Sequence, residues 1–358
     1  MAREAVLVSY RLGGTDGVSV EAGKWEWALH VLGFTTRRIA GHICDAPRPD
    51  DVVLPGIAIE APVGAADSRP LATALAGADL VVAENICSLP INVHASEAAS
   101  DALACHRGRV AFHHHDLPWQ RAELASVRGF PPDLPGALHV VVNDRSRAEL
   151  AARGLTAHTI RNTFDFDARP GDRDPTRAEL GIDDEDVLVL QPTRAIPRKN
   201  VPGGVRFAEA LAGFVPERPV VYWLTGPAED GYDRALARII ATTPLRVVHG
   251  RSARPADAYA AADVVVFPST WEGFGNPVIE SVVARRPLAV HRYPVLDEIL
   301  SGLRVFSVED PAAVAGFLQT PDLDVLDANR EVARRDFSLA DLPARLENAF
   351  ESNGWTSW

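Results

Sequence analysis

The chain has 358 residues, of which 47% are apolar and 7% aromatic, and its formal net charge is -12. This length favours two domains, each large enough to bury its own core, and the composition is that of an ordinary soluble α/β protein. The negative charge argues against nucleic-acid wrapping and against a strongly membrane-attracted surface, although a local basic cluster could still bind a nucleotide.

The cysteines and the N-terminus indicate the compartment. Cys44, Cys87 and Cys105 show no metal-ligand spacing, and their number is odd. We therefore expect a reduced, cytoplasmic setting in which all three are buried small apolar residues. The first ten residues are too short and too mixed for a signal peptide, and no stretch approaches the length of a membrane span.

The N-terminal half alternates apolar strands with helical or loop segments, as a doubly wound sheet does. Its strands are expected at residues 5–10, 51–54, 80–83, 109–113 and 139–144. The first strand runs into a loop containing Gly13 and Gly14, and a helix is expected from about 18 to 32. A strand, a glycine loop and a helix open a Rossmann-like domain, but no dinucleotide fingerprint (GxGxxG) follows, and a simple tight turn remains the alternative.

Polar residues follow two of these strands, at the edge where open α/β sheets bind ligands. They are Glu84 with Asn85, and the run His113, His114, His115 and Asp116. In an extended segment the first and third histidines point one way and the second the other. The run could bind a sugar hydroxyl or an acceptor, hold a metal ion together with Asp116, or be structural. The sequence leaves open which histidine faces a ligand.

The second half begins after a linker. Residues 166–174 are rich in Asp, Arg, Pro and Gly, which predicts an exposed connection and a domain boundary near 168. Further strands are expected at 187–190, 220–226, 245–251, 263–268 and 287–291, and a last helix at 342–350. The acidic residues 183–186 lie between a helix end and a strand, where a solvated turn is favoured over a metal site.

A basic loop follows the first strand of this half. It carries Arg194, Arg198 and Lys199 just before a predicted helix. Arginine and lysine side chains in such a loop stabilise a departing diphosphate, whose negative charge grows as its bond breaks. For Arg198 the sequence also leaves open a side chain that faces the solvent.

Residues 269–280 contain the most informative pattern of the chain. A buried strand is followed by a glycine-bearing loop and a helix start, with Asn276 expected as N-cap and Pro277 at the first helical position. Together these features predict an anion site. Glu272 lies in the loop and Glu280 one turn into the helix, so the two cannot form an acid/base pair on one helix face. Because carboxylates repel phosphate, each is expected to accept hydrogen bonds from hydroxyls.

The sequence EGFGNPVIE at 272–280 closely resembles the signature of the family 4 retaining glycosyltransferases. That family has the GT-B fold, in which two Rossmann-like domains face each other across a cleft. The resemblance implies an acceptor domain at 1–167 and a nucleotide-sugar donor domain at 168–335, with a C-terminal helix at about 336–358 that packs back on the first. Asn276 stands where many members carry an apolar residue, which could affect donor choice. Trp355 and Trp358 could pin the last helix, or the tail could be frayed.

The resemblance also implies the site. Glu272 would touch the donor sugar, Glu280 would hold the ribose, and Arg194 and Lys199 would bind the diphosphate. The implied catalytic residues are Arg194, Lys199, His115 and Glu272. The implied donor-binding residues are Gly13, Gly14, His113, Arg198, Gly226, His249, Gly250, Arg251, Gly273, Phe274, Gly275, Asn276 and Glu280. No metal and no cofactor are expected, since a nucleoside-diphosphate sugar serves as donor substrate.

The expected function is retaining transfer of a hexosyl group from a UDP- or GDP-sugar to an unidentified hydroxyl acceptor. Neither glutamate lies convincingly where a covalent intermediate would form, so a front-face mechanism is favoured, with the leaving phosphate helping to deprotonate the acceptor. The expected partners are these small molecules, with no nucleic acid, and the oligomeric state is open. The alternatives are a non-catalytic nucleotide-sugar binder, a Rossmann-type oxidoreductase, and a sugar-phosphate phosphorylase or synthase of the same fold.

Overall fold

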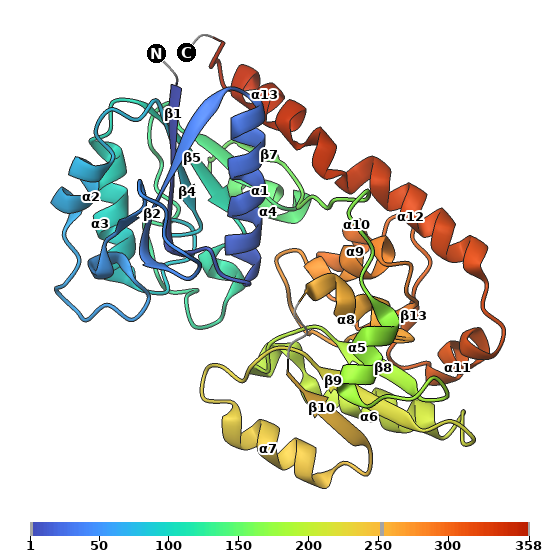
Figure 1. The fold of residues 1–358 in the computed structure, drawn as a ribbon. Helices are drawn as coiled ribbons and strands as arrows, with labels where there is room; N and C mark the ends of the chain where they lie inside the picture. Colours follow the sequence, from blue (N-terminus) through green and yellow to red (C-terminus); the bar gives the residue numbers. More distant parts are fainter. Residues whose placement is uncertain (1–2, 251–253, 357–358) are drawn as a thin grey trace. The chain divides into compact units, whose positions relative to one another are not determined.

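The computed structural model describes residues 3–250 and 254–356. The chain forms two compact units, each a sheet with helices packed around it (Figure 1). Unit 1 comprises the chain up to Thr163 and from Leu339 onward, and unit 2 runs from Phe164 to Ser338. The first division thus falls between Thr163 and Phe164, and the boundary predicted from the sequence lies near 168.

Unit 1 contains a parallel sheet with the strand order β3-β2-β1-β4-β5-β6-β7. Its strands are β1 (Arg3–Leu12), β2 (Phe34–Ile43), β3 (Val52–Val53), β4 (Leu80–Glu84), β5 (Arg109–His114), β6 (Leu138–Val141) and β7 (Ala157–Thr159). Its α-helices are α1 (Gly17–Val31), α2 (Ser68–Ala74), α3 (Val93–Ala104), α4 (Asp144–Ala151) and α13 (Leu342–Ser352). Short 3₁₀ turns lie at Pro55–Ile57, Pro118–Gln120 and Leu339–Asp341.

Strand β2 was not expected from the sequence, because arginines interrupt its apolar pattern. The structure accommodates Arg38 by pairing it with two carboxylates. Its guanidinium lies 2.9 Å from Asp45 and 2.6 Å from Asp51, and the Arg38 side chain is only 5% exposed. In the sequence the charge of Arg38 is typical of a loop, but in the structure its side chain is buried and paired with these carboxylates.

The chain's last helix completes the core of unit 1. Leu342, Leu346 and Phe350 of α13 are buried in one cluster with Trp25 of α1. Trp355 joins the same cluster and is pinned rather than frayed. Trp358 lies outside the described residues.

The expectation that all cysteines are buried is right for Cys87 and wrong for the other two. Cys44 and Cys105 are exposed. Each lies just past the end of an element, Cys44 after β2 and Cys105 as the C-cap of α3, where the chain reaches the surface.

Unit 2 contains a parallel sheet in the order β10-β9-β8-β11-β12-β13. Its strands are β8 (Val187–Gln191), β9 (Val220–Leu224), β10 (Arg246–His249), β11 (Val264–Phe267), β12 (Leu288–Val290) and β13 (Phe306–Ser307). Its helices are α5 (Arg173–Leu180), the 3₁₀ turn η3 (Pro197–Lys199), α6 (Val201–Ala212), α7 (Asp233–Thr242), α8 (Pro255–Ala261), α9 (Asn276–Val283), α10 (Leu296–Ile299), α11 (Pro311–Gln319) and α12 (Leu323–Phe337). No helix in the described part of the chain has the length and apolarity needed to cross a membrane.

The two sheets reverse their strand order at equivalent places. The first strand of each unit pairs with the second on one side and with the fourth on the other: β1 lies between β2 and β4, and β8 between β9 and β11. Open α/β sheets bind ligands beyond the carboxyl ends of the strands at this reversal. The loops after β1 and β4 in unit 1, and after β8 and β11 in unit 2, are therefore the places to look for sites.

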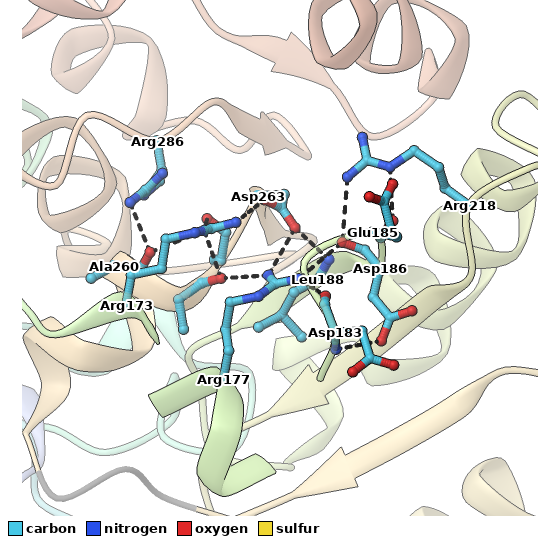
Figure 2. A network of polar contacts seen from close by, with 12 residues as sticks. Arg173, Arg177, Asp183, Glu185, Asp186, Leu188, Arg218, Ala260, Asp263 and Arg286 are labelled. Atoms are coloured by element: carbon cyan, nitrogen blue, oxygen red, sulfur yellow. Dashed lines mark hydrogen bonds and ion pairs between the residues drawn. The ribbon is translucent and has the colours of Figure 1, made fainter. Parts of the chain in front are cut away.

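An arginine network anchors the first helix of unit 2 (Figure 2). Arg173 and Arg177 of α5 both pair with Asp263, at 2.7 and 3.1 Å, and both bond the carbonyl of Ala261 at the end of α8. Asp263 in turn accepts the N–H of Leu188 in β8 at 2.8 Å. Since Arg177 is fully buried and every bond is charge-assisted, the network ties α5, α8 and the sheet together.

The acidic residues 183–186 do form a turn, but it is only partly solvated. Asp183, Asp184 and Glu185 are exposed, as expected, whereas Asp186 is buried. The carboxylate of Asp186 accepts the N–H of Asp183 at 3.1 Å, and its carbonyl accepts a bond from Arg177 at 3.0 Å (Figure 2).

Candidate active site

The two loops at the strand reversal of unit 2 are bonded to each other. The N–H of Thr270 donates to the carbonyl of Arg198 at 2.9 Å, and Arg198 Nη1 donates to the carbonyl of Trp271 at 3.2 Å. Asn200 caps α6 through its side chain and also donates to the carbonyl of Pro268 at 3.2 Å. The basic loop after β8 and the glycine loop after β11 therefore form one surface.

Glu272 lies at the centre of this surface. Its Oε2 is 2.5 Å from Arg198 Nη1, and its Oε1 is 2.5 Å from Lys199 Nζ. Burial raises the pKa of the Glu272 carboxyl, but Lys199 and Arg198 outweigh it and lower that pKa to about 2. Two cations thus share one ionised carboxylate, and the group of three carries a net positive charge.

Lys199 is largely buried: its side chain is 11% exposed. Burial lowers the pKa of its ammonium, Glu272 opposes this change, and Nζ lies 5.7 Å from the centre of the Phe267 ring. A partly desolvated ammonium interacts strongly with an added anion, because little water has to be displaced. Lys199 is accordingly well suited to meet a phosphate oxygen.

Arg194 lies on the same loop but has a different partner. Its Nη1 is 2.5 Å from Glu229 Oε2, and both side chains are about one-third exposed. Gly226 allows the loop after β9 to approach this segment: a Cβ on Gly226 would lie 2.6 Å from the Arg194 Cα. Gly226 therefore has a packing role beside Arg194, and its contact with a ligand stays a prediction.

Helix α9 begins at Asn276, one residue before the expected first position, so Asn276 is not its N-cap. The cap position is held by Gly275, which has φ +101°. A Cβ there would lie 2.3 Å from Tyr293 Oη, which itself donates to the carbonyl of Phe274 at 2.8 Å. The glycine is required because this left-handed turn is packed against a tyrosine. Pro277 occupies the first turn, as expected.

The side chain of Phe274 belongs to the core. Its ring packs on Phe164 and Phe337, with centroids 6.2 and 5.7 Å away, at the place where the chain enters and leaves unit 2. The ring of Phe274 is therefore buried, and any contact of this residue with a donor would have to come from its backbone.

Glu280 is oriented by a residue that the sequence did not single out. Tyr259 of α8 is buried, and its hydroxyl donates to Glu280 Oε2 at 2.5 Å. Arg286 holds α8 in place by donating to the carbonyls of Tyr259 and Ala260 at 3.0 and 2.7 Å. Sequence spacing gives no signal for such a contact, because α8 and α9 are separated by a strand and a loop.

The loop expected to hold the base follows β10. His249 Nε2 lies 2.9 Å from the carbonyl of Gly226, and the carbonyl of Gly250 accepts a bond from Trp223 Nε1 at 2.9 Å. These contacts bring the ends of β9 and β10 together. Arg251 lies outside the described residues.

In unit 1, Gly13 and Gly14 follow β1 at the strand reversal. Gly13 has φ +74°, and a Cβ on it would lie 2.2 Å from Asp45 Oδ1. Asp16 then caps α1 by accepting the N–H of Ser19. Both the tight-turn interpretation and a close backbone approach to a ligand agree with this geometry.

The histidine run divides as the alternation predicted. His113 Nδ1 and His115 Nε2 lie 2.9 and 3.1 Å from the same atom, Glu84 Oε2. His114 points the other way, to Ser88 Oγ at 2.5 Å and His139 Nδ1 at 2.9 Å. Burial raises the pKa of the Glu84 carboxyl, but its two histidine partners lower it to about 2. Glu84 is therefore an ionised, fully buried acceptor for two imidazoles.

Comparison with known proteins places this geometry in a family context. Residues 195–320 match the family described as "Glycosyl transferases group 1". The mannosylglucosylglycerate synthase of Thermotoga maritima is 26% identical over 96% of this chain and 94% of its own. The D-inositol 3-phosphate glycosyltransferase of Rhodococcus erythropolis is 34% identical over 34% of this chain and 29% of its own.

Solved structures show the same fold. The Anabaena protein HepE, solved with UDP and glucose, has a TM-score of 0.71 at 16% identity and covers 98% of this chain and 100% of its own. Sucrose-phosphate synthase from Thermosynechococcus elongatus has a TM-score of 0.73 at 15% identity, over 99% of this chain and 100% of its own.

Two parallel sheets with interleaved helices and these structural neighbours define a GT-B protein. The matched segment, which contains Lys199, Glu272 and Glu280, and the full-length relatives identify the chain as a glycosyltransferase.

Proposed function

We propose that the protein is a retaining, family 4 glycosyltransferase that moves a hexosyl group from a nucleoside-diphosphate sugar to a hydroxyl acceptor. The observation that carries this proposal is the bonded pair of loops in unit 2, in which Glu272 holds Arg198 and Lys199 beside the glycine turn that precedes α9. A net positive cluster next to a helix N-terminus is suited to a diphosphate.

Each residue then has a role in this proposal. Lys199, Arg198 and Arg194 stabilise the leaving diphosphate, while Glu280 holds the ribose in the orientation given by Tyr259. Glu272 positions the cations and offers an oxygen to the donor sugar once the diphosphate draws the cations toward itself. In this proposal the base lies along the loop after β10, and Arg194, Arg198 and Lys199 take the part that a metal ion would play at the diphosphate.

Unit 1 binds the acceptor in this proposal, through Gly13, Gly14, His113 and His115. Two relatives that match nearly the whole chain, from Thermotoga maritima and Petrotoga mobilis, are mannosylglucosylglycerate synthases. They favour a mannosyl donor and a small sugar-acid acceptor. The HepE complex with UDP-glucose keeps a UDP-sugar as the second candidate donor.

The test has two steps. A thermal-shift panel of UDP-, GDP- and ADP-sugars first identifies the donor, which should raise the melting temperature. Incubation of that donor with glucosylglycerate, followed by NMR of the product, then gives the anomeric configuration, and we expect it to match that of the donor. An inverted product would refute the retaining assignment. Donor binding with neither transfer nor donor hydrolysis would favour the non-catalytic alternative.

A further inference from the structure

We propose that Glu84, His113 and His115 of unit 1 bind a divalent transition-metal ion such as Zn²⁺ or Co²⁺. Glu84 and His113 lie opposite each other on the neighbouring parallel strands β4 and β5, and His115 follows the end of β5. They meet at the carboxyl edge of the sheet. In sequence they are separated by a helix, so only the fold brings the set together.

The ligand atoms already have nearly the spacing of a metal site. One atom from each residue can be chosen so that all three lie within 4.8 Å of one another. Glu84 Oε2 lies 2.9 Å from His113 Nδ1 and 3.1 Å from His115 Nε2. A tetrahedral ion with bonds of about 2.0–2.2 Å separates its ligand atoms by roughly 3.3 Å. An ion would therefore need these two pairs to move apart by only a few tenths of an ångström.

A second observation points to a missing ligand. Glu84 Oε1 is buried and has no hydrogen-bond partner among the described residues. Leaving such an oxygen unsatisfied costs about 1–3 kcal/mol. A cation bound between the imidazoles and the carboxylate would be attracted to this oxygen as well, and one carboxylate with two imidazoles is a common zinc ligand set.

The surroundings hold the ligands in place. The ring of Trp25 stacks on that of His113 with centroids 4.1 Å apart, and Asn85 Oδ1 accepts the backbone N–H of His115 at 3.1 Å. Neighbours of this kind orient metal ligands and strengthen binding. His115 is 9% exposed, against 1% for His113 and 0% for Glu84, so a fourth coordination position would open on the side of His115.

An oxygen ligand, such as a hydroxyl or carboxylate of the acceptor, would occupy this fourth position. That role rests on the proposed function of unit 1, whereas metal binding itself does not. Zn²⁺ or Co²⁺ would act on the acceptor side only, since the diphosphate is assigned to the cations of unit 2.

The test is a Co²⁺ titration of the untagged, full-length protein after treatment with a chelator. We expect the visible absorption bands of tetrahedral Co²⁺ to saturate at one ion per chain, and Zn²⁺ to displace them. His115→Gln should weaken binding about 100-fold or more, as should Glu84→Gln. His114→Gln is the matched control, because this adjacent buried histidine faces Ser88 and His139 instead.

Thermal melting gives a second readout that does not depend on activity. Zn²⁺ should raise the melting temperature of the wild type and of His114→Gln, and leave that of His115→Gln unchanged. Absence of Co²⁺ bands in the wild type would overturn the proposal, and so would equal binding by His114→Gln and His115→Gln. A bound metal without any effect on transfer would overturn only the acceptor role.

Discussion

The two units have the same strand order around their central strands, yet the residues at their strand reversals differ in kind. Unit 2 places Arg198 and Lys199 around one carboxylate, beside a glycine turn. Unit 1 places two imidazoles on one buried carboxylate. In the function proposed above, the shared topology fixes the edge of each sheet at which a ligand binds, and the loops decide whether that edge receives the diphosphate or the acceptor.

The largest effect should come from the cations of unit 2. We expect Lys199→Ala to lower kcat about 100-fold or more, because it removes a charge that stabilises the leaving diphosphate. Glu280→Ala should instead raise the donor KM and change kcat less. Steady-state kinetics at varied donor concentration measure kcat and KM for both variants, and circular dichroism checks that they are folded. If both variants kept near-wild-type kinetics, the assignment of the anion site to unit 2 would be wrong.

The glycine turn can be tested through stability. Gly275→Ala places a Cβ 2.3 Å from Tyr293 Oη in a left-handed conformation, and we expect it to lower the free energy of unfolding by about 2–4 kcal/mol. Gly231→Ala is the matched control, because Gly231 has φ +73° with open space around it, and its cost should be about 1 kcal/mol. Urea unfolding measures both. Equal losses would show that packing on Tyr293 does not demand the glycine.

The ion group of Glu272 should make stability depend on pH. Its folded-state pKa of about 2 lies below the ordinary value of 4.5, so its contribution is complete above about pH 5 and is lost as the pH falls toward 2. The full loss is about 3 kcal/mol. Urea unfolding between pH 7 and pH 3 should show a shallower decline for Glu272→Gln than for the wild type.

Glu229→Gln provides the control for this pH effect. Glu229 pairs with Arg194 at a partly exposed position, where an ion pair contributes little. The free energy of unfolding of Glu229→Gln should therefore change with pH as that of the wild type does. If Glu272→Gln did the same, Lys199 and Arg198 would not lower the pKa of Glu272 as described above.

The smallest effect concerns the orientation of Glu280. Tyr259→Phe removes one hydrogen bond to the carboxylate, and we expect the donor KM to rise about 5- to 10-fold with kcat unchanged at saturation. Tyr232→Phe, at the start of α7, is a control that should leave KM unchanged. A fall in kcat without a change in KM would indicate that Tyr259 acts on the chemical step instead.

Much of the fold and of the candidate site could be predicted from the sequence, because the strongest sequence patterns are local. The strand, glycine loop and proline at 263–280 are contiguous, and the helix they predict is present, displaced by one residue. The separation of His114 from His113 and His115 followed from strand alternation alone. These features depend on neighbours in the chain, which a single sequence displays.

What could not be predicted depends on contacts across the fold. Strand β2 contains Arg38, whose burial depends on Asp45 and Asp51 reaching it. The bond from Tyr259 to Glu280 depends on α8 packing beside α9. Asp186 lies in an acidic run typical of a solvated turn, yet its carbonyl accepts a hydrogen bond from the buried Arg177. A charged residue in a sequence does not reveal which partner will neutralise it.

The position of α13 has a consequence for how the chain is made. Its apolar face fills part of the core of unit 1, although it leaves the ribosome only after the whole of unit 2. The continuous segment that forms unit 2 can complete its own core before α13 is synthesised, whereas unit 1 keeps an open apolar surface until α13 has been made. Deletion of α13 should therefore expose the core of unit 1 and cause aggregation through that unit.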